Sequence, residues 1–249
     1  MNTARLAAQP LADGGTAVQE WVESPLSLPE LDMRGCAGLV VVGAHPDDET
    51  LGFGAAMAML AETGTEVQIV SASDGGAAFP EASRARRNQL EQQRRAELCR
   101  AAVVLGVRSP IGLGLPDGEI AQHEGRLADL LTDLLAARPA GTWCAATWRG
   151  DGHPDHEAVG RAAAVAASRT GAVLVEYPVW MWHWARPGDP AVPWSTASAV
   201  AASATALRRK TAAAECFRSQ FVPPAPGVAP VLPEYVLSRL LAVGEVVFR

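Results

Sequence analysis

The sequence predicts an α/β fold with a Rossmann-like, mostly parallel sheet, helices on both faces, and a C-terminal elaboration. Short apolar runs rich in β-branched residues alternate along the chain with longer helical patterns, as expected for parallel strands joined by crossover helices. A run such as 38–43 is continuously apolar, which indicates a strand buried on both faces. Gly64 and Gly106 follow two of the helical patterns directly, where helices usually end.

The alternation predicts each element in turn from residue 38 to residue 177. Apolar composition predicts the strands, and Arg-, Gln- and Glu-rich or Ala-rich patterns predict the helices. The predicted strands are 38–43, 66–71, 111–115, 142–148 and 172–177, and the predicted helices are 50–63, 81–105, 124–137 and 156–169.

The two ends of the chain have a different character. Residues 1–34 are mixed in pattern and predict an irregular lead-in, whereas 185–249 predict a C-terminal elaboration. Within that elaboration we expect a loop with Pro and Trp (185–200), a helix (205–218), a Pro-rich stretch (222–233), a helix (234–242) and a strand-like end (245–248). No internal repeat and no linker is evident, so we expect one domain over residues 1–249.

Composition excludes several classes of protein. The formal charge is −6, with 21 basic against 27 acidic residues, so bulk electrostatics exclude a strongly basic nucleic-acid binder. No apolar run approaches the ~20 residues of a membrane helix, and the N-terminus lacks a secretory signal pattern. The four cysteines are scattered without a C-x-x-C pair, which predicts mostly buried free thiols in a cytoplasmic protein.

A first polar cluster, Ala44-His45-Pro46-Asp47-Asp48-Glu49, directly follows the first predicted strand. Ligands bind at the carboxyl ends of strands in open parallel sheets, and imidazole and carboxylate are ligands of catalytic zinc. His45 and Asp48 could share one ion, with Asp47 close to it but turned elsewhere. A dinucleotide site is excluded because no G-x-G-x-x-G is present and the acidic residues would repel a pyrophosphate. The alternative is that Asp47 or Asp48 only caps the next helix.

A second polar cluster, residues 148–157, follows a later predicted strand and contains His153, Asp155 and His156. Since a parallel sheet brings the carboxyl ends of its strands to one edge, His156 can supply a third ligand to the ion bound by His45 and Asp48. Three of the five histidines of the chain lie in these two clusters, which favours a metal site over isolated surface histidines.

These residues resemble the LmbE/PIG-L-like family of zinc-dependent N-deacetylases. The family's A-H-P-D-D-E motif is matched by 44–49, and its H-P-D-H motif by 153–156. The resemblance implies that His45, Asp48 and His156 bind zinc and that Asp47 is the general base. It also implies that His153, held by Asp155, stabilises the oxyanion as an imidazolium.

Three further positions are expected to contact substrate. Arg94 resembles the arginine of the family's R-x-x-E pattern and could bind a substrate hydroxyl or phosphate; alternatively it pairs with Glu97 on a solvated helix face. Asp117 resembles a turn aspartate that accepts hydrogen bonds from sugar hydroxyls, although Pro-Asp-Gly is also an ordinary turn. At Asp151 the mycothiol-type deacetylases carry tyrosine, so this carboxylate either favours a cationic substrate or ends the strand.

The expected function is removal of an N-acetyl or N-acyl group from an amino sugar or glycoconjugate by an enzyme with one Zn²⁺ per chain, Fe²⁺ or Co²⁺ being possible. The alternatives are a non-catalytic sugar- or nucleotide-binding module and a metal-dependent phosphoesterase, which would need a second metal. The Trp-rich segment 180–194 either stacks on substrate or fills the core or a dimer contact. The oligomeric state is left open.

Overall fold

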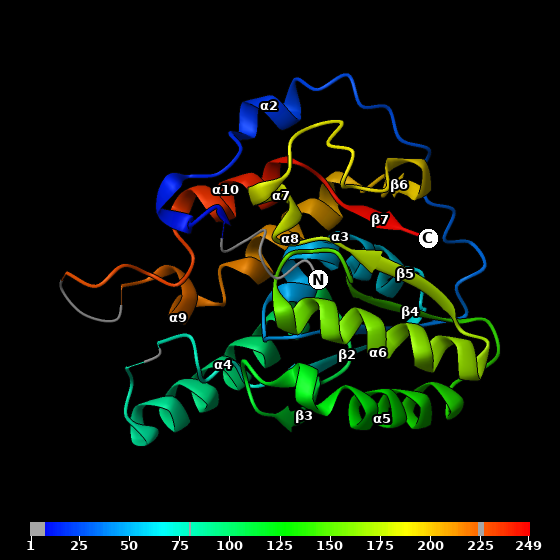
Figure 1. Cartoon of the computed structure of the whole chain (residues 1–249). Coiled ribbons are helices and arrows are strands. Elements are labelled where there is room, and N and C mark those ends of the chain that lie inside the picture. Colours follow the sequence, from blue (N-terminus) through cyan, green and yellow to red (C-terminus); the bar gives the residue numbers. More distant parts are fainter. Residues whose placement is uncertain (1–7, 80, 224–226) are drawn as a thin grey trace.

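The computed structural model describes residues 8–79, 81–223 and 227–249, and its centre is a twisted seven-stranded sheet (Figure 1). The spatial order is β3-β2-β1-β4-β5-β7-β6. The first five strands are parallel, and β7 runs antiparallel to both of its neighbours. The bounds are β1 (Gly38–Gly43), β2 (Glu66–Ser73), β3 (Ile111–Leu115), β4 (Thr142–Thr147), β5 (Val173–Tyr177), β6 (Ala197–Ala199) and β7 (Val246–Phe248). The predicted mostly parallel sheet is confirmed.

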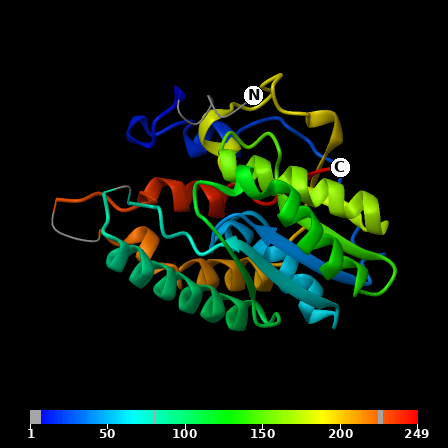
Figure 2. The same ribbon diagram turned by 60° about the horizontal axis from the view of Figure 1, so that its bottom comes forward.

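Helices cover both faces of the sheet (Figure 2). Alternate residues of β1 enter separate hydrophobic cores: Leu39 and Val41 belong to one, and Val40 and Val42 to the other. The longer helices are α3 (Asp48–Glu62), α4 (Arg84–Leu105), α5 (Glu124–Ala136), α6 (Pro154–Thr170), α8 (Ala204–Ala214) and α10 (Glu234–Ala242). The first core includes residues of α3, α4 and α8, and the second includes residues of α5 and α6. The shorter helices are α2 (Val18–Val22), α7 (Met181–Trp184) and α9 (Arg218–Phe221), with 3₁₀ turns at Leu11–Asp13, Ile120–His123 and Trp194–Thr196.

The helix α3 is kinked, and the C-terminal part of the chain stabilises the kink. Phe53 has non-helical dihedral angles (φ −144°, ψ 18°). The Glu245 carboxylate accepts the backbone N–H groups of Ala55 and Ala56 at 2.7 and 2.9 Å, so it acts as an N-cap for the second half of the helix. Lys210, the one lysine of the chain, pairs with Glu245 at 3.0 Å, and both side chains are buried.

Three segments differ from the sequence prediction. The lead-in contains the helix α2, and Glu30 bridges to Ala199, whereas residues 1–7 lie outside the described part of the chain. The predicted loop 185–200 contributes β6 to the edge of the sheet. The helix predicted at 205–218 ends at Ala214 as α8, and the short helix α9 begins at Arg218. Of these differences, β6 and the bridge at Glu30 depend on pairing with distant segments, which a local pattern does not encode.

Within the described residues, no helix is both long and apolar enough to cross a lipid bilayer. All four cysteines are free thiols. Cys36 and Cys144 are buried, Cys216 is partly exposed, and Cys99 is exposed on α4. The expectation of mostly buried thiols therefore holds for two of the four.

Candidate active site

The first polar cluster forms the tight turn between β1 and α3. The Asp48 carboxylate accepts the backbone N–H of His45 at 2.8 Å, which closes the turn. Asp47, the N-cap residue of α3, has φ 136°, in a region that residues with a side chain rarely occupy and that costs about 1–3 kcal/mol. Its backbone N–H is accepted by the buried Glu49 carboxylate at 3.3 Å. The Asp47 side chain makes no capping hydrogen bond to α3.

The second polar cluster forms the turn between β4 and α6. His153 is the N-cap residue of α6, and Pro154 begins the helix. His156, in the first turn of α6, is fully buried. Because β1 and β4 are neighbouring parallel strands, their carboxyl ends lie side by side, and the order of the sheet reverses direction between them. This is the position where open α/β sheets bind ligands.

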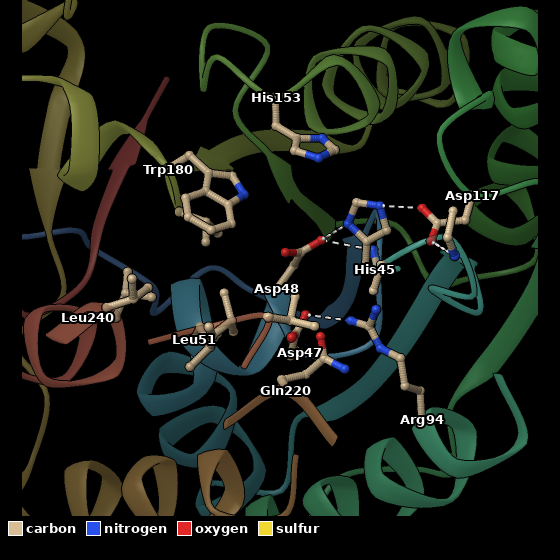
Figure 3. Close-up of a pocket in the computed structure, with 16 residues that line it drawn as sticks. His45, Asp47, Asp48, Leu51, Arg94, Asp117, His153, Trp180, Gln220 and Leu240 are labelled. Carbon is tan, nitrogen blue, oxygen red and sulfur yellow. Dashed lines mark hydrogen bonds and ion pairs between the residues drawn. The ribbon is translucent and has the colours of Figure 1, made fainter. Parts of the chain in front are cut away.

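The two turns bring His45, Asp48 and His156 together, and Figure 3 shows His45 beside Asp48. One ligand atom of each lies within 4.8 Å of the others. The His45 Nδ1 is 3.4 Å from one Asp48 oxygen, and the His156 Nε2 is 3.2 Å from the other. The buried His156 Nε2 has no hydrogen-bond partner in the described chain. An imidazole nitrogen in this position fits a metal ligand.

In each of these histidines, the ring nitrogen that is turned away from Asp48 lies close to other carboxylates. The His45 Nε2 lies 3.0 Å from Asp117 and 3.3 Å from Asp155, and the His156 Nδ1 lies 2.8 Å from Asp151. Such carboxylates orient metal-binding histidines and fix their tautomer. The donor set and its surroundings therefore fit a bound divalent cation.

The carboxylates also dominate the electrostatics of both imidazoles. Burial alone lowers the pKa of His156, but Asp48 and Asp151 outweigh burial and raise that pKa to about 9. For His45, burial is likewise outweighed by hydrogen bonds to Asp117, Asp155 and Asp48, and its pKa is raised well above the ordinary value. The cluster therefore favours added positive charge, which a proton or a divalent cation can supply.

Asp47 lines the same pocket and has an unusual protonation equilibrium. Burial raises the pKa of its carboxyl to about 7, against the opposing effect of the Arg94 guanidinium 3.3 Å away. Arg94 is itself buried and donates to the backbone carbonyls of Gly75 and Pro46, each at 3.0 Å. A Cβ at Gly75 would clash with this guanidinium, so the glycine permits the close approach. A carboxyl with a pKa near 7 suits proton transfer at neutral pH.

His153 lines the pocket but is not held as expected. The His153 Nδ1 accepts the backbone N–H of Asp155 at 3.2 Å, which places the ring proton on Nε2. The Asp155 carboxylate instead accepts the backbone N–H groups of Gly118 and Ile120 at 2.8 and 3.2 Å. Burial, together with the positive charge of His156 and His45, lowers the pKa of His153 to about 3. The Asp155 carboxylate therefore does not hold the His153 ring as expected; the backbone N–H of Asp155 does, and the ring presents its Nε2.

Asp151, expected as a substrate contact, is fully buried and away from the pocket lining. Its carboxylate receives His156 and the backbone N–H groups of Val179, Trp180 and Met181 at 2.9–3.0 Å. All of its acceptor capacity is used within the protein. The expectation of a substrate contact is therefore corrected: Asp151 orients His156 and anchors the chain after β5.

Arg94 and Asp117 do line the pocket, as expected of substrate contacts. The alternative pairing of Arg94 with Glu97 is not formed, because Glu97 accepts the backbone N–H and hydroxyl of Ser219 at 3.0 and 2.6 Å. Asp117 accepts the Ala77 N–H at 2.7 Å. The two side chains therefore support the turns around the pocket and also face it.

The pocket encloses about 620 Å³, including its open mouth, and much of its lining was not found from the sequence. Trp180 is the one tryptophan of the Trp-rich segment in this lining, since Trp182 and Trp184 are buried in the core. The unforeseen lining residues are Leu51, Ala77, Ala78, Val179, Gln220, Val231, Leu232, Val236 and Leu240. Apart from the tryptophan pattern, these positions carry no local signal of function.

Sequence comparisons agree with the geometry. Residues 40–167, or 128 of 249, match the family model described as PIG-L: GlcNAc-PI de-N-acetylase. A 1D-myo-inositol 2-acetamido-2-deoxy-alpha-D-glucopyranoside deacetylase of Mycobacterium sp. (strain KMS) is 32% identical over 174 residues, which is 59% of this chain and 54% of that protein. A protein of the same name from Kribbella flavida is 30% identical over 165 residues, 54% of each chain. The chain thus spans about half the length of these curated relatives.

Solved structures share the fold. The conserved protein TT1542 of Thermus thermophilus is similar with a TM-score of 0.58 and 26% identity, over 82% of this chain and 84% of that one. The A40926 pseudoaglycone deacetylase Dbv21 has a TM-score of 0.61 and 20% identity, over 85% and 96% of the two chains. At that identity the second likeness concerns the fold alone. Since the matched family model covers more than half of the chain and includes both polar turns, the protein belongs to the PIG-L family.

Proposed function

We propose that this protein is a metal-dependent hydrolase that removes the N-acetyl, or a related N-acyl, group of an amino sugar or amino-sugar conjugate. The observation that carries the proposal is the convergence of His45, Asp48 and His156 on one point, at a pocket that His45, Asp48 and the neighbouring Asp47 line. The names of the curated relatives, which are deacetylases of an acetamido sugar, support it.

His45, Asp48 and His156 would hold one divalent ion. Two imidazoles and a carboxylate suit Zn²⁺, and also accommodate Fe²⁺ or Co²⁺. The buried Nε2 of His156 supports this assignment, because it lies 3.2 Å from Asp48 without a hydrogen bond to any residue that the structure describes. When bound, the ion supplies Lewis acidity, which polarises a carbonyl and lowers the pKa of water.

Asp47 acts as the general base in this proposal. With a pKa of about 7, its carboxylate can take a proton from the attacking water and return it to the departing amine. Arg94 holds Asp47 in place and supports its ionised form. The strained backbone of Asp47 directs the carboxylate into the pocket, where it can meet substrate rather than cap α3.

His153 acts as a hydrogen-bond donor to the developing oxyanion. Since its Nδ1 accepts a backbone N–H, its Nε2 carries the proton and is free to donate. Asp117, at the other side of His45, is available to accept from a sugar hydroxyl. Trp180 at the pocket wall offers a face for a sugar ring.

The test is a screen for amine release by purified, zinc-loaded protein against a panel of N-acetylated amino sugars and conjugates. A chelator should abolish turnover, and zinc should restore it. The variant Asp47→Asn should keep its zinc but lose about 10²–10⁴-fold in kcat, the usual contribution of general acid–base catalysis. The exposed Asp133 of α5 provides the matched control, Asp133→Asn, with unchanged kcat.

Two alternative functions predict different results. A non-catalytic binding module would bind sugars without releasing amine. A phosphoesterase would hold two metals about 3.5–4 Å apart; a second possible donor group, His45, His153 and Asp155, shares His45 with the first. A metal content of one per chain together with amine release supports the deacetylase, and nearly full activity of Asp47→Asn contradicts the proposed role of Asp47.

A further inference from the structure

The pocket has two chemically different walls (Figure 3). The polar wall includes Arg94 and Asp117, and Figure 3 shows Trp180, Leu51 and Leu240 on the side opposite to them. The apolar wall, as we name it, consists of Leu51, Trp180, Leu232, Val236 and Leu240. It faces the same space as the proposed catalytic residues, so a substrate at the metal-binding cluster also meets this wall.

The apolar wall is a folded part of the molecule. Val236 and Leu240 lie four residues apart on α10 and therefore on one face of that helix, and each is about 3% exposed. The backbone N–H of Leu232 donates to the Gln220 carbonyl at 2.8 Å. Ser219, next to Gln220, is held by Glu97 of α4. The residues of the wall are thus held in place by the helix α10 and by the hydrogen bonds that connect Leu232, through Gln220 and Ser219, to α4.

This wall suits only part of a sugar conjugate. A sugar or a polyol presents hydroxyl groups in almost every direction, and a buried hydroxyl without a hydrogen-bond partner is unfavourable. The side chains of Leu232, Val236 and Leu240 offer no such partner. An alkyl or aryl group, in contrast, gains free energy when it leaves water for such a surface.

We propose that the substrate carries an apolar group beside the scissile amide, either an apolar aglycone or an N-acyl chain longer than acetyl, which packs on the apolar wall. This inference rests on the proposed function for the position of the amide. The inferred substrate differs from the inositol conjugate that the name of the curated relatives specifies, since inositol is a polyol.

The test measures binding, so that it does not depend on turnover. Zinc-loaded Asp47→Asn protein is titrated calorimetrically with two ligand pairs. The first pair is methyl and n-hexyl N-acetylglucosaminide, which vary the aglycone, and the second is N-acetyl- and N-hexanoylglucosamine, which vary the acyl chain. Each methylene buried on the wall should tighten binding about fourfold, so the hexyl or hexanoyl ligand of one pair should bind at least about tenfold more tightly.

Substitutions in the wall provide the structural control. The favoured pair is the one whose longer ligand binds more tightly, and its ratio is the affinity for the longer ligand divided by that for the shorter one. Val236→Thr preserves the shape of the side chain but introduces a hydroxyl, and it should reduce this ratio about fivefold. Val222→Thr makes the same change at an exposed valine that follows α9, and should leave the ratio unchanged. Unfolding curves of both variants confirm that they remain folded.

The outcomes separate the two proposals. A gain in the first pair assigns the apolar group to the aglycone, and a gain in the second assigns it to the acyl chain. Equal affinities within both pairs overturn the inference, as does a Val236→Thr protein with an unchanged ratio. If the longer ligands bind more tightly but the wild-type protein releases no amine from any of them, the apolar wall stands and the deacetylase function falls.

Discussion

Replacing Asp151 by asparagine should weaken metal binding without touching a proposed metal ligand. The Asp151 carboxylate receives four N–H groups: Oδ2 receives His156 and Trp180 at 2.8 and 2.9 Å, and Oδ1 receives Val179 and Met181 at 3.0 and 2.9 Å. An asparagine side chain has one acceptor oxygen, so two of these four donors lose their acceptor whichever way the amide is turned.

The magnitude follows from this geometry. Each buried donor left without a partner destabilises the protein by about 1–3 kcal/mol, so Asp151→Asn should lower the free energy of unfolding by about 2–6 kcal/mol. The neutral amide also attracts the N–H of the His156 ring less strongly than the carboxylate does, and an amide turned with its NH₂ group towards His156 cannot accept from that ring at all. Outer carboxylates of this kind typically contribute about 10–100-fold to metal affinity, and we expect a loss in that range.

Zinc affinity is measured by competition with a chromogenic chelator, and stability by urea denaturation of the zinc-free protein. The matched control is Glu176→Gln. Glu176 is a buried carboxylate that accepts the backbone N–H of Arg149 at 3.0 Å and pairs with its guanidinium, but it contacts neither proposed histidine ligand. It should lose stability while keeping its zinc affinity. A folded Asp151→Asn protein that binds zinc as tightly as the wild type would refute the orienting role of Asp151.

Two further predictions concern buried groups away from the pocket. Lys210→Met leaves the Glu245 carboxylate buried without its cation and should lower the free energy of unfolding, measured in urea, by about 3–5 kcal/mol. Adding Glu245→Gln to this variant should restore part of the lost stability. Strictly additive effects of the two changes would contradict the pairing. At pH 8, iodoacetamide should label the exposed Cys99 but spare Cys36 and Cys144, because burial raises the pKa of these two thiols to about 11 and 12. Their reactive thiolates form only as the pH rises towards those values, so mass spectrometry that finds Cys144 alkylated in folded protein at pH 8 would contradict its burial.

Much of the fold could be predicted from local pattern. The strands at 38–43 and 111–115 and the helix at 234–242 have the predicted bounds, and the other three strands of the parallel sheet differ by no more than two residues at either end. Continuous apolar runs and helix-ending glycines are local signals, and a parallel sheet follows from their alternation. The meeting of His45 with His156 was also predictable, because the carboxyl ends of parallel strands share one edge.

The roles of individual acidic residues were decided by tertiary structure. Asp151 and Asp155 lie in the same polar turn, yet the Asp151 carboxylate binds His156 and the chain after β5, whereas the Asp155 carboxylate binds Gly118 and His45. No spacing in the sequence distinguishes the two. A carboxylate accepts from whichever donors the fold brings near it, and here most of those donors come from distant segments.

The sequence by itself therefore determined the kind of fold and the chemical character of the site: an α/β sheet with imidazoles and carboxylates at the edge where strands end. Only the tertiary structure decided which carboxylates orient histidines, which ones line the pocket, and that α10 contributes two residues to an apolar wall opposite the polar one. The physical reason is the separation along the sequence of the residues that interact. Secondary structure and strand-end turns arise from neighbours in sequence, whereas pKa values, hydrogen-bond partners and pocket walls arise from contacts between segments far apart in the chain.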